Sequence, residues 1–391
     1  MKQNISVGID IGSSSTRVVV CEHTGDPLPR VTGVGIAETR GLRHGYIINR
    51  EEAVGSLRKA LKEAEKESGM RIRSANLAIG GVGLSSEYAS GSSVVTRADA
   101  IISKFDIEKA IQDAEGTLEL KNRTILHAFP MLFKVDGKEL PTRPEGTQGH
   151  KLEVKVLFIT CFEQHLDDLI AVVNEAGIKV LNFVATPIAT QKLLLTDLQK
   201  NFGCALVDVG AETVSVAVFE NNTLASLYVF GLGSLDITKD IALGLRITPE
   251  EAESIKLGVV SFQNVSKKKL DEIIEARLSD IFELVDKYLK KIGRSGLLPA
   301  GAIIIGNGSQ LPSIDAVAKA MLKIPIRMGH IDIPSTKGVL KERRLLTAYA
   351  VAASISDQGS SKSSRSSSSS SSNDGDGFLD TIKNFFKQLM P

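Results

Sequence analysis

Two stretches of this sequence place an aspartate, a glycine and several small or hydroxyl-bearing residues between two apolar runs. The first is VGIDIGSSSTRVVV at residues 7–20, and the second is ALVDVGAETVSVAVF at residues 205–219. Each pattern predicts two β-strands joined by a short turn. Three positions match in register across the two stretches, as an internal duplication would leave them: Asp10 with Asp208, Gly12 with Gly210, and Ser15 with Thr213.

The residue types of these turns suit a nucleotide phosphate site. Facing each other across a cleft, they would point backbone N–H groups and hydroxyls at a polyphosphate, while the two aspartates hold Mg²⁺ through its water ligands. A third stretch, IIIGNGSQLP at residues 303–312, ends an apolar strand in glycines that would let a purine ring lie against the backbone. One such turn alone is weak evidence, because hairpins favour Gly and Ser for backbone reasons. The sequence contains neither a P-loop nor a Rossmann glycine fingerprint.

The composition predicts a large globular protein of two or more domains. The chain has 391 residues, of which 42% are hydrophobic, enough for cores that need no disulfide or metal. Its 47 basic and 46 acidic residues nearly cancel, so nucleic acid is not an expected partner. Cys21, Cys161 and Cys204 lie in or beside apolar runs without metal-ligand spacing, which predicts core positions. The polar N-terminus and the lack of a ~20-residue apolar run predict a cytoplasmic protein with no signal peptide and no membrane span.

Hydrophobic periodicity predicts an α/β order of elements that positions the three turns. We expect amphipathic helices at residues 51–67 and 270–292, the first with a cap at Asn49. Residues 84–162 alternate in short runs and predict a small inserted α+β unit. The other predicted helices cover residues 106–117, 163–176, 187–198, 234–245, a segment from Thr248, a segment from Leu311, and 343–354. The other predicted strands cover residues 31–37, 75–80, 180–183 and 324–327.

The last part of the chain has a different composition. Residues 357–377 are mostly Ser, Gly and Asp, which predicts a disordered linker because such residues cannot build a core. The segment 378–391 predicts an amphipathic helix. Such a terminal helix usually docks on its own domain or on a partner, but its position after a long linker, with Lys383 and Lys387 beside the apolar stripe, also suits a bilayer surface. The stripe consists of Phe378, Leu379, Ile382, Phe385, Phe386, Leu389 and Met390.

The three turns resemble the phosphate-1, phosphate-2 and adenosine motifs of the actin, Hsp70 and sugar-kinase superfamily. Within it the chain resembles the FtsA family of bacterial cell-division proteins, through the insertion, RGLRHGYIIN at residues 40–49, DITKDIALGLRITPEEAESIK at residues 236–256, and the amphipathic tail. The resemblance covers essentially the whole chain apart from the linker, and it implies an actin-like, ribonuclease H-like α/β fold of two domains. The implied parts are subdomain 1A at 1–83 and 163–200 with the helix 341–356 packed against it, the inserted subdomain 1C at 84–162, subdomain 2A at 201–238 and 296–340, subdomain 2B at 239–295, the linker at 357–377, and a membrane-targeting helix at 378–391.

The resemblance also implies roles for individual residues. Asp10 and Asp208 would be associated with Mg²⁺, and Glu253 and Lys256 would lie by the ribose of ATP. Without the resemblance, Glu253 and Lys256 would be interpreted as a solvated surface pair. The implied phosphate cradle is Gly12, Ser13, Ser14, Ser15 and Thr16 with Gly210, Ala211, Glu212 and Thr213, and the implied adenine turn is Gly306, Asn307 and Gly308.

Three departures from the family pattern bear on activity. Thr186 stands before Pro187 where relatives often have a carboxylate, so a residue that would orient the attacking water is missing. The second turn reads GAET instead of a glycine run, and the third reads GNGS instead of three glycines. We therefore expect ATP to bind and support assembly while hydrolysis is weak or absent. Turnover at ~1 per second or faster, an ordinary enzyme rate, would contradict this expectation.

The function implied by the resemblance is that of a polymerising adaptor, which tethers filaments of the tubulin-like division protein FtsZ to the membrane. Its expected partners are further copies of itself, the FtsZ C-terminal peptide, the lipid surface and other divisome proteins, at the cytoplasmic face of the cell membrane at the division site. The peptide is expected to dock at residues 239–295, where basic side chains could meet it: Lys267, Lys268, Lys269, Arg277 and Arg294. Two alternatives on the same fold remain, a PilM-like pilus-assembly adaptor, which normally lacks such a tail, and a small-molecule kinase, which would need a substrate base in the cleft.

Overall fold

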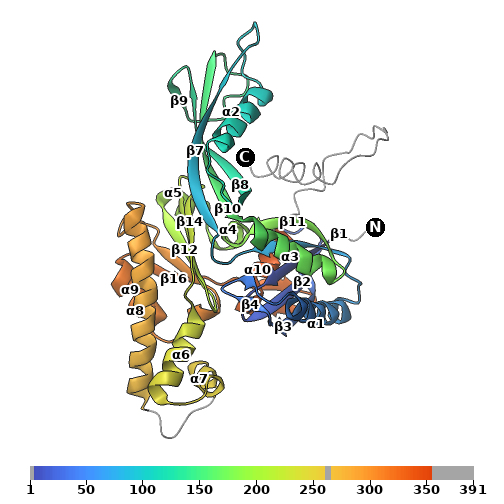
Figure 1. The fold of residues 1–391 in the computed structure, drawn as a ribbon, viewed down its shortest axis with the longest axis vertical. Helices are drawn as coiled ribbons and strands as arrows, with labels where there is room; N and C mark the ends of the chain where they lie inside the picture. The colour runs from blue at the N-terminus through green and yellow to red at the C-terminus, as the bar shows by residue number, and fades with distance from the viewer. Residues whose placement is uncertain (1–3, 260–265, 355–391) are drawn as a thin grey trace.

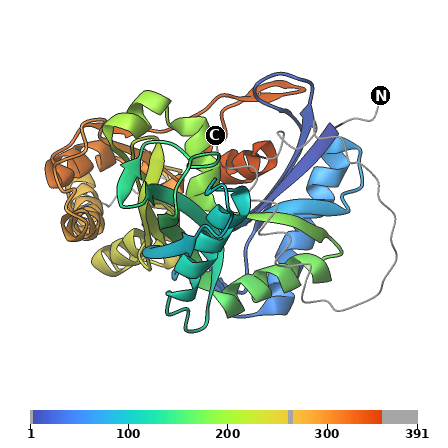
Figure 2. The same cartoon turned by 90° about the horizontal axis from the view of Figure 1, so that it is seen from above.

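Two large β-sheets organise two lobes of this protein. The computed structural model describes residues 4–259 and 266–354, so the predicted linker and tail helix lie outside the described residues. The lobes lie side by side, and an inserted unit projects from the region where they meet (Figure 1). Seen from above, the blue strands of the first lobe lie on one side and the orange helices of the second lobe on the other (Figure 2). The strand orders are β11-β6-β1-β2-β3-β17-β18 and β16-β15-β12-β13-β14-β7-β10-β8-β9.

The first sheet begins with an antiparallel meander of β1 (Asn4–Ile11), β2 (Ser15–His23) and β3 (Arg30–Glu38). Two further strands extend it in parallel: β6 (Ser74–Ile79) pairs with β1, and β11 (Lys179–Ala185) pairs with β6. Three helices cover its faces, namely α1 (Arg50–Ser68), α3 (Glu163–Glu175) and α10 (Leu346–Ala353). Tyr349 of α10 is fully buried and donates a hydrogen bond to the Pro29 carbonyl oxygen at 2.9 Å. The last helix of the described chain is therefore fixed to the first lobe.

The second sheet repeats this topology. Its antiparallel meander consists of β12 (Cys204–Val209), β13 (Val214–Glu220) and β14 (Thr223–Phe230). Again two strands extend it in parallel: β15 (Ala302–Ile305) pairs with β12, and β16 (Ile326–Met328) pairs with β15. The matched strand orders agree with the duplication predicted from the two turns.

Within its described residues, the second lobe also contains the helices α6 (Ser234–Leu245), α7 (Pro249–Lys256), α8 (Lys267–Lys291) and α9 (Ile314–Leu322). The long helix α8 runs along the side of the lobe (Figure 1). Its predicted apolar face is buried at Ile274, Leu278, Ile281, Phe282, Val285 and Leu289. Periodicity at helical spacing therefore identified this element correctly.

The inserted unit is an antiparallel sheet with one helix on it. Its elements are β7 (Ser85–Val94), α2 (Lys104–Gly116), β8 (Arg123–Val135), β9 (Lys138–Leu140) and β10 (Lys151–Phe162). The chain enters and leaves it from the first lobe, yet β7 also pairs with β14 of the second lobe, through Ser85 and Tyr228. The unit therefore touches both lobes at its base.

The remaining short elements connect these layers. A two-stranded hairpin of β4 (Leu42–Arg43) and β5 (Tyr46–Ile47) precedes α1. The helices α4 (Thr186–Leu194) and α5 (Asp197–Phe202) lead from the first lobe to the second. The others are the 3-10 turns at Asn307–Gln310 and Arg343–Leu345 and the strands β17 (Ile333–Ser335) and β18 (Gly338–Leu340).

Several predicted boundaries were wrong. The helix expected at residues 187–198 is split, because Leu195 takes extended backbone angles and the Thr196 hydroxyl caps a new helix by accepting from Gln199 N. The helix expected from Leu311 begins at Ile314, after a 3-10 turn and Ser313 with φ 63°. The last predicted strand, 324–327, begins two residues later and ends one residue later, at Ile326–Met328. The cap predicted at Asn49 is confirmed, since its side chain accepts from Glu52 N at 3.3 Å.

Candidate functional site

A cleft of about 1000 Å³, its open mouth included, lies where the two lobes meet. All three predicted turns contribute to its lining. The predicted residues that line it are Asp10, Gly12, Ser13, Ser14, Asp208, Gly210, Ala211, Thr213, Gly306 and Asn307.

The two phosphate-like turns have the same backbone geometry. In the first, Gly12 N donates to Ser15 O at 3.1 Å, and in the second Gly210 N donates to Thr213 O at 2.9 Å. Each turn follows the strand that carries the aspartate, β1 for Asp10 and β12 for Asp208. The strand order therefore brings both carboxylates to the cleft from opposite lobes.

The two aspartates differ in their charge environment. Asp10 accepts a hydrogen bond from the Arg17 guanidinium at 2.6 Å, and both side chains are largely buried. Burial raises the pKa of Asp208 to about 6; the nearby Asp10 carboxylate adds to this rise and Arg17 opposes it. Asp208 is therefore a carboxyl group that changes charge close to neutral pH.

Arg17 is a cleft residue that the sequence analysis missed. The hairpin register pairs Asp10 with Arg17, and in the second hairpin it pairs Asp208 with Ser215. This pairing follows from the turn, since a hairpin closed between Gly12 and Ser15 places residues 10 and 17 opposite each other. The hairpin register, which follows from the turn, could therefore have predicted from the sequence that Arg17 lies beside the Asp10 carboxylate.

The cleft residues fit a Mg²⁺ ion that arrives with a nucleotide. Among the described residues, no group of three or more His, Cys, Asp or Glu side chains is placed to hold a metal alone. Mg²⁺ commonly takes one or two carboxylates and completes its shell with waters and phosphate oxygens. Asp10 and Asp208 offer two carboxylates on opposite sides of the same cleft.

Some predicted site residues do not line the cleft. Thr16 is buried, and its hydroxyl shares a 2.7 Å hydrogen bond with Thr39, since the residue belongs to β2 and faces the lobe interior. Glu212 turns toward His44. Ser15 and Gly308 also lie outside the lining residues.

Glu253 and Lys256 form an ion pair on α7, with Lys256 Nζ 2.7 Å from Glu253 Oε2. Lys256 is buried rather than solvated, and burial lowers its pKa. Its ammonium group donates to the Ser234 carbonyl oxygen at 3.1 Å, and Ser234 N donates to Gly210 O at 2.9 Å. The pair is therefore linked through Ser234 to Gly210 of the second turn, and it supports the start of α6.

The start of α4 forms part of the first-lobe wall of the cleft. Thr186 lines it and donates a hydrogen bond from its hydroxyl to Ile79 O at 3.3 Å. His165 lies nearby and is buried, with Nε2 2.8 Å from Gly80 O, and burial lowers its pKa. His165, Arg343 and Arg344 line the cleft and were not predicted, because their positions depend on long-range packing.

Comparison with known families assigns two parts of the chain. The model described as "Cell division protein FtsA" matches residues 205–353, and "SHS2 domain inserted in FTSA" matches residues 81–160. The cell division protein FtsA of Bacillus subtilis is 32% identical over 343 residues, covering 82% of this chain and 78% of its own. The FtsA of Pseudomonas aeruginosa is 29% identical over 344 residues, covering 83% and 82%. The FtsA of Escherichia coli K12 is 25% identical and covers 84% of both chains.

Solved structures show that the fold is the actin-like α/β fold. The PilM-PilN type IV pilus biogenesis complex matches with a TM-score of 0.65 at 16% identity, covering 89% of this chain and 97% of that chain. MreB5 of Spiroplasma citri bound to AMPPNP matches with a TM-score of 0.51 at 12% identity, covering 90% and 95%. At these identities the likeness concerns the fold alone. Within the described residues, no helix combines the length and apolarity needed to cross a membrane.

Proposed function

Because the chain belongs to the FtsA family of cell-division proteins, we propose that it binds ATP, polymerises, and tethers FtsZ filaments to the cytoplasmic face of the membrane at the division site. The observation that carries the proposal is the pair of matched turns, which face one cleft from two duplicated lobes. MreB5, which shares the fold, has been solved with AMPPNP and with ADP.

In the proposed ATP complex, the backbone N–H groups and hydroxyls of the two turns hold the phosphates. Mg²⁺ would neutralise phosphate charge, and Asp10 and Asp208 would hold its water ligands. Arg17 offsets the charge of Asp10 and lies next to the first turn, at the phosphate end of the site. Gly306 and Asn307 flank the adenine, and the Glu253–Lys256 pair, which lies outside the cleft lining, is proposed to support the second turn on the ribose side.

The proposed membrane contact is made by the predicted tail helix, residues 378–391, and filament contacts by the inserted subdomain 1C. FtsZ's C-terminal peptide is proposed to dock on subdomain 2B. Arg277 and Arg294 already pair with Asp240 and Glu220, each at 2.6 Å. The exposed Lys267 is therefore the better candidate to meet an acidic peptide, since Lys268 lies 3.9 Å from Glu272.

Hydrolysis is proposed to be slow, because Thr186 offers a hydroxyl where a carboxylate would orient water. That hydroxyl donates to Ile79 O, and a neutral hydroxyl is too weakly basic to take a proton from the attacking water as a carboxylate does. Slow hydrolysis would leave ATP bound to the protein long enough to act as an assembly signal.

The raised pKa of Asp208 predicts a pH-dependent affinity for Mg²⁺–ATP. Above about pH 6 the carboxylate is charged and attracts the metal; below it a proton occupies the group, so the Mg²⁺-dependent gain in affinity should fall by up to about tenfold per pH unit. The measurement is titration calorimetry between pH 5 and pH 8, with Mg²⁺ and with chelator.

The matched control for this titration is Asp208→Asn, which keeps the size of the side chain and cannot ionise. It should bind ATP with a small, pH-independent Mg²⁺ effect. An equal Mg²⁺-dependent step in the Asp208→Asn variant would assign the titration to the nucleotide's own phosphate and remove Asp208 from the proposed metal site.

The alternative functions find less support. The likeness to PilM is at 16% identity and concerns the fold, whereas the FtsA relatives match in sequence over most of the chain. A small-molecule kinase would need a general base beside its substrate. A screen of sugar and carboxylate acceptors for phosphorylation would reveal such a kinase.

A further inference from the structure

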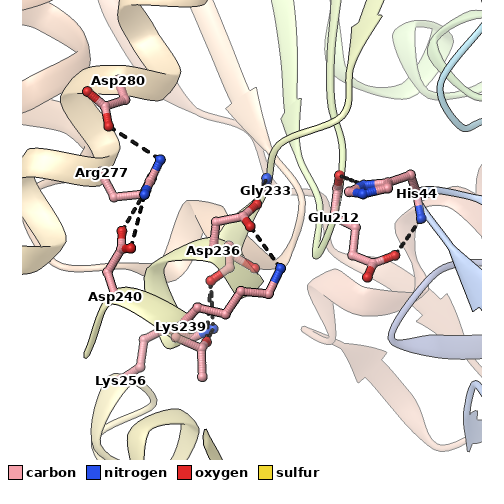
Figure 3. A network of polar contacts seen from close by, with 11 residues as sticks. His44, Glu212, Gly233, Asp236, Lys239, Asp240, Lys256, Arg277 and Asp280 are labelled. Atoms are coloured by element: carbon pink, nitrogen blue, oxygen red, sulfur yellow. Dashed lines mark hydrogen bonds and ion pairs between the residues drawn. The ribbon is translucent and has the colours of Figure 1, made fainter. Parts of the chain in front are cut away.

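The β4–β5 hairpin, residues 42–47, touches both phosphate-like turns. His44 N donates to the Glu212 carboxylate at 2.6 Å, and His44 Nδ1 lies 3.2 Å from Glu212 O. The next residue, Gly45, donates from its N–H to the Ser13 hydroxyl at 3.1 Å. Figure 3 shows His44 on the first lobe meeting Glu212 on the second. The neighbouring backbone N–H groups of His44 and Gly45 therefore hold both turns, the turn of the second lobe through Glu212 and the turn of the first lobe through Ser13.

The same hairpin reaches the base of the inserted unit through Tyr46. The Tyr46 ring lies edge-on to His165, with ring centroids 5.0 Å apart, and 6.5 Å from the ring of Phe162. Phe162 is the last residue of β10, where the chain leaves the inserted unit. Tyr46 also packs against Gly83, just before the chain enters that unit: a Cβ added there would lie 2.8 Å from the Tyr46 hydroxyl.

Arg123 fixes this base. Its guanidinium lies 4.9 Å from the centroid of the Phe162 ring and donates to Gly83 O at 2.6 Å and to the Ser85 hydroxyl at 2.7 Å. It also donates to the Thr160 hydroxyl at 2.9 Å. The strands that enter and leave the inserted unit, β7 and β10, are thus joined at the point where Tyr46 packs.

We propose that this hairpin, residues 42–47, is a clasp that ties nucleotide binding in the cleft to the position of the inserted unit. Glu212 is its positioning residue on the second lobe, and Tyr46 is its contact with the insertion base. The proposal rests on the cleft being the ATP site. It gives Glu212, which does not line the cleft, a task that a glycine at this position could not perform.

The physical argument is that one short element shares its contacts between two sites. A ligand that draws the turns together shifts the positions of the two acceptors, Glu212 for His44 N and Ser13 for Gly45 N. Because Tyr46 follows these residues directly, its ring moves with them against Phe162 and His165. Packed groups change between discrete arrangements rather than deform smoothly, so a small shift at the turns can reach β7.

The first test separates the hydrogen bond of Glu212 from its charge. Glu212→Gln and Glu212→Ala both remove the negative charge, but only the glutamine can still accept from His44 N. In the full chain with Mg²⁺, Glu212→Ala should bind ATP roughly tenfold more weakly than Glu212→Gln, because its turn is no longer held. Equal affinities would overturn the positioning role of Glu212.

The second test measures coupling by amide hydrogen exchange at saturating ATP. In the unmodified full chain, ATP should change exchange in residues 42–47 and in β7 (Ser85–Val94). Tyr46→Ala should keep the change at the turns and lose it in β7, while Tyr46→Phe, which keeps the ring, should retain both.

Two outcomes would overturn the clasp: ATP binding without a change in β7, or a β7 change that survives Tyr46→Ala in a variant whose melting temperature shows it is folded. An unmodified chain that binds no ATP would instead refute the proposed nucleotide site. The two failures are therefore distinguishable.

Discussion

Replacing Gly306 with alanine is expected to weaken ATP binding by about 100-fold or more, equivalent to ~2.7 kcal/mol. An added Cβ would lie 2.3 Å from Asp208 Oδ1 and 2.4 Å from Val209 O, distances that force the turn or the end of β12 to move. Both shifts displace groups that the proposed complex uses, the Asp208 carboxylate and the adenine turn. Titration calorimetry with Mg²⁺–ATP measures the loss.

The matched control is Gly177→Ala. Gly177 has φ +90°, close to the +85° of Gly306, but a Cβ there would meet nothing within 4 Å. Both substitutions impose the strain of a left-handed backbone on alanine, so both should lower the melting temperature. Only Gly306→Ala should lose ATP, and equal ATP affinities in the two variants would contradict a nucleotide site at this turn.

Truncation after Gly377 is expected to abolish co-sedimentation with liposomes. It removes the apolar stripe of the predicted tail helix together with Lys383 and Lys387, and each lysine contributes only about 1 kcal/mol at an anionic surface. A single tail should therefore bind reversibly, and polymerisation should strengthen the attachment because many tails act together on one filament.

A full-length variant with Phe385→Glu and Phe386→Glu separates insertion from charge attraction, and it should also fail to pellet with liposomes. Deleting residues 360–372 of the serine-rich segment provides the matched control, since it shortens the chain and keeps the tail. That deletion should still co-sediment. Pelleting of the truncated chain at the level of the full chain would refute the membrane role of the tail.

The parts of the site that the sequence predicted are those set by local backbone chemistry. Gly12 and Gly210 close equivalent turns, and Asp10 and Asp208 are the next-to-last residues of equivalent strands, because the turn residues and the apolar runs dictate both. The direction of the Thr16 side chain was also predictable, since side chains alternate between the two faces of a strand and Thr16 shares a face of β2 with the buried Val18 and Val20. Treating residues 12–16 as one cradle overlooked this alternation.

Other features depend on contacts between distant segments, which periodicity does not encode. The bond between His44 and Glu212 joins residues 168 positions apart, and Lys256 is buried because α7 packs behind the second turn. The contact of β7 with β14 at Ser85 and Tyr228 likewise joins an insertion of the first lobe to the sheet of the second. These positions follow from how the lobes assemble around the cleft.

The most direct test of the account is electron microscopy of the full chain mixed with anionic liposomes, with and without Mg²⁺–ATP. The account predicts membrane-bound filaments with ATP, few or none without it, and membrane attachment without filaments for Gly306→Ala. A full chain that neither binds the liposomes nor forms filaments with ATP would contradict it and favour a kinase on the same fold.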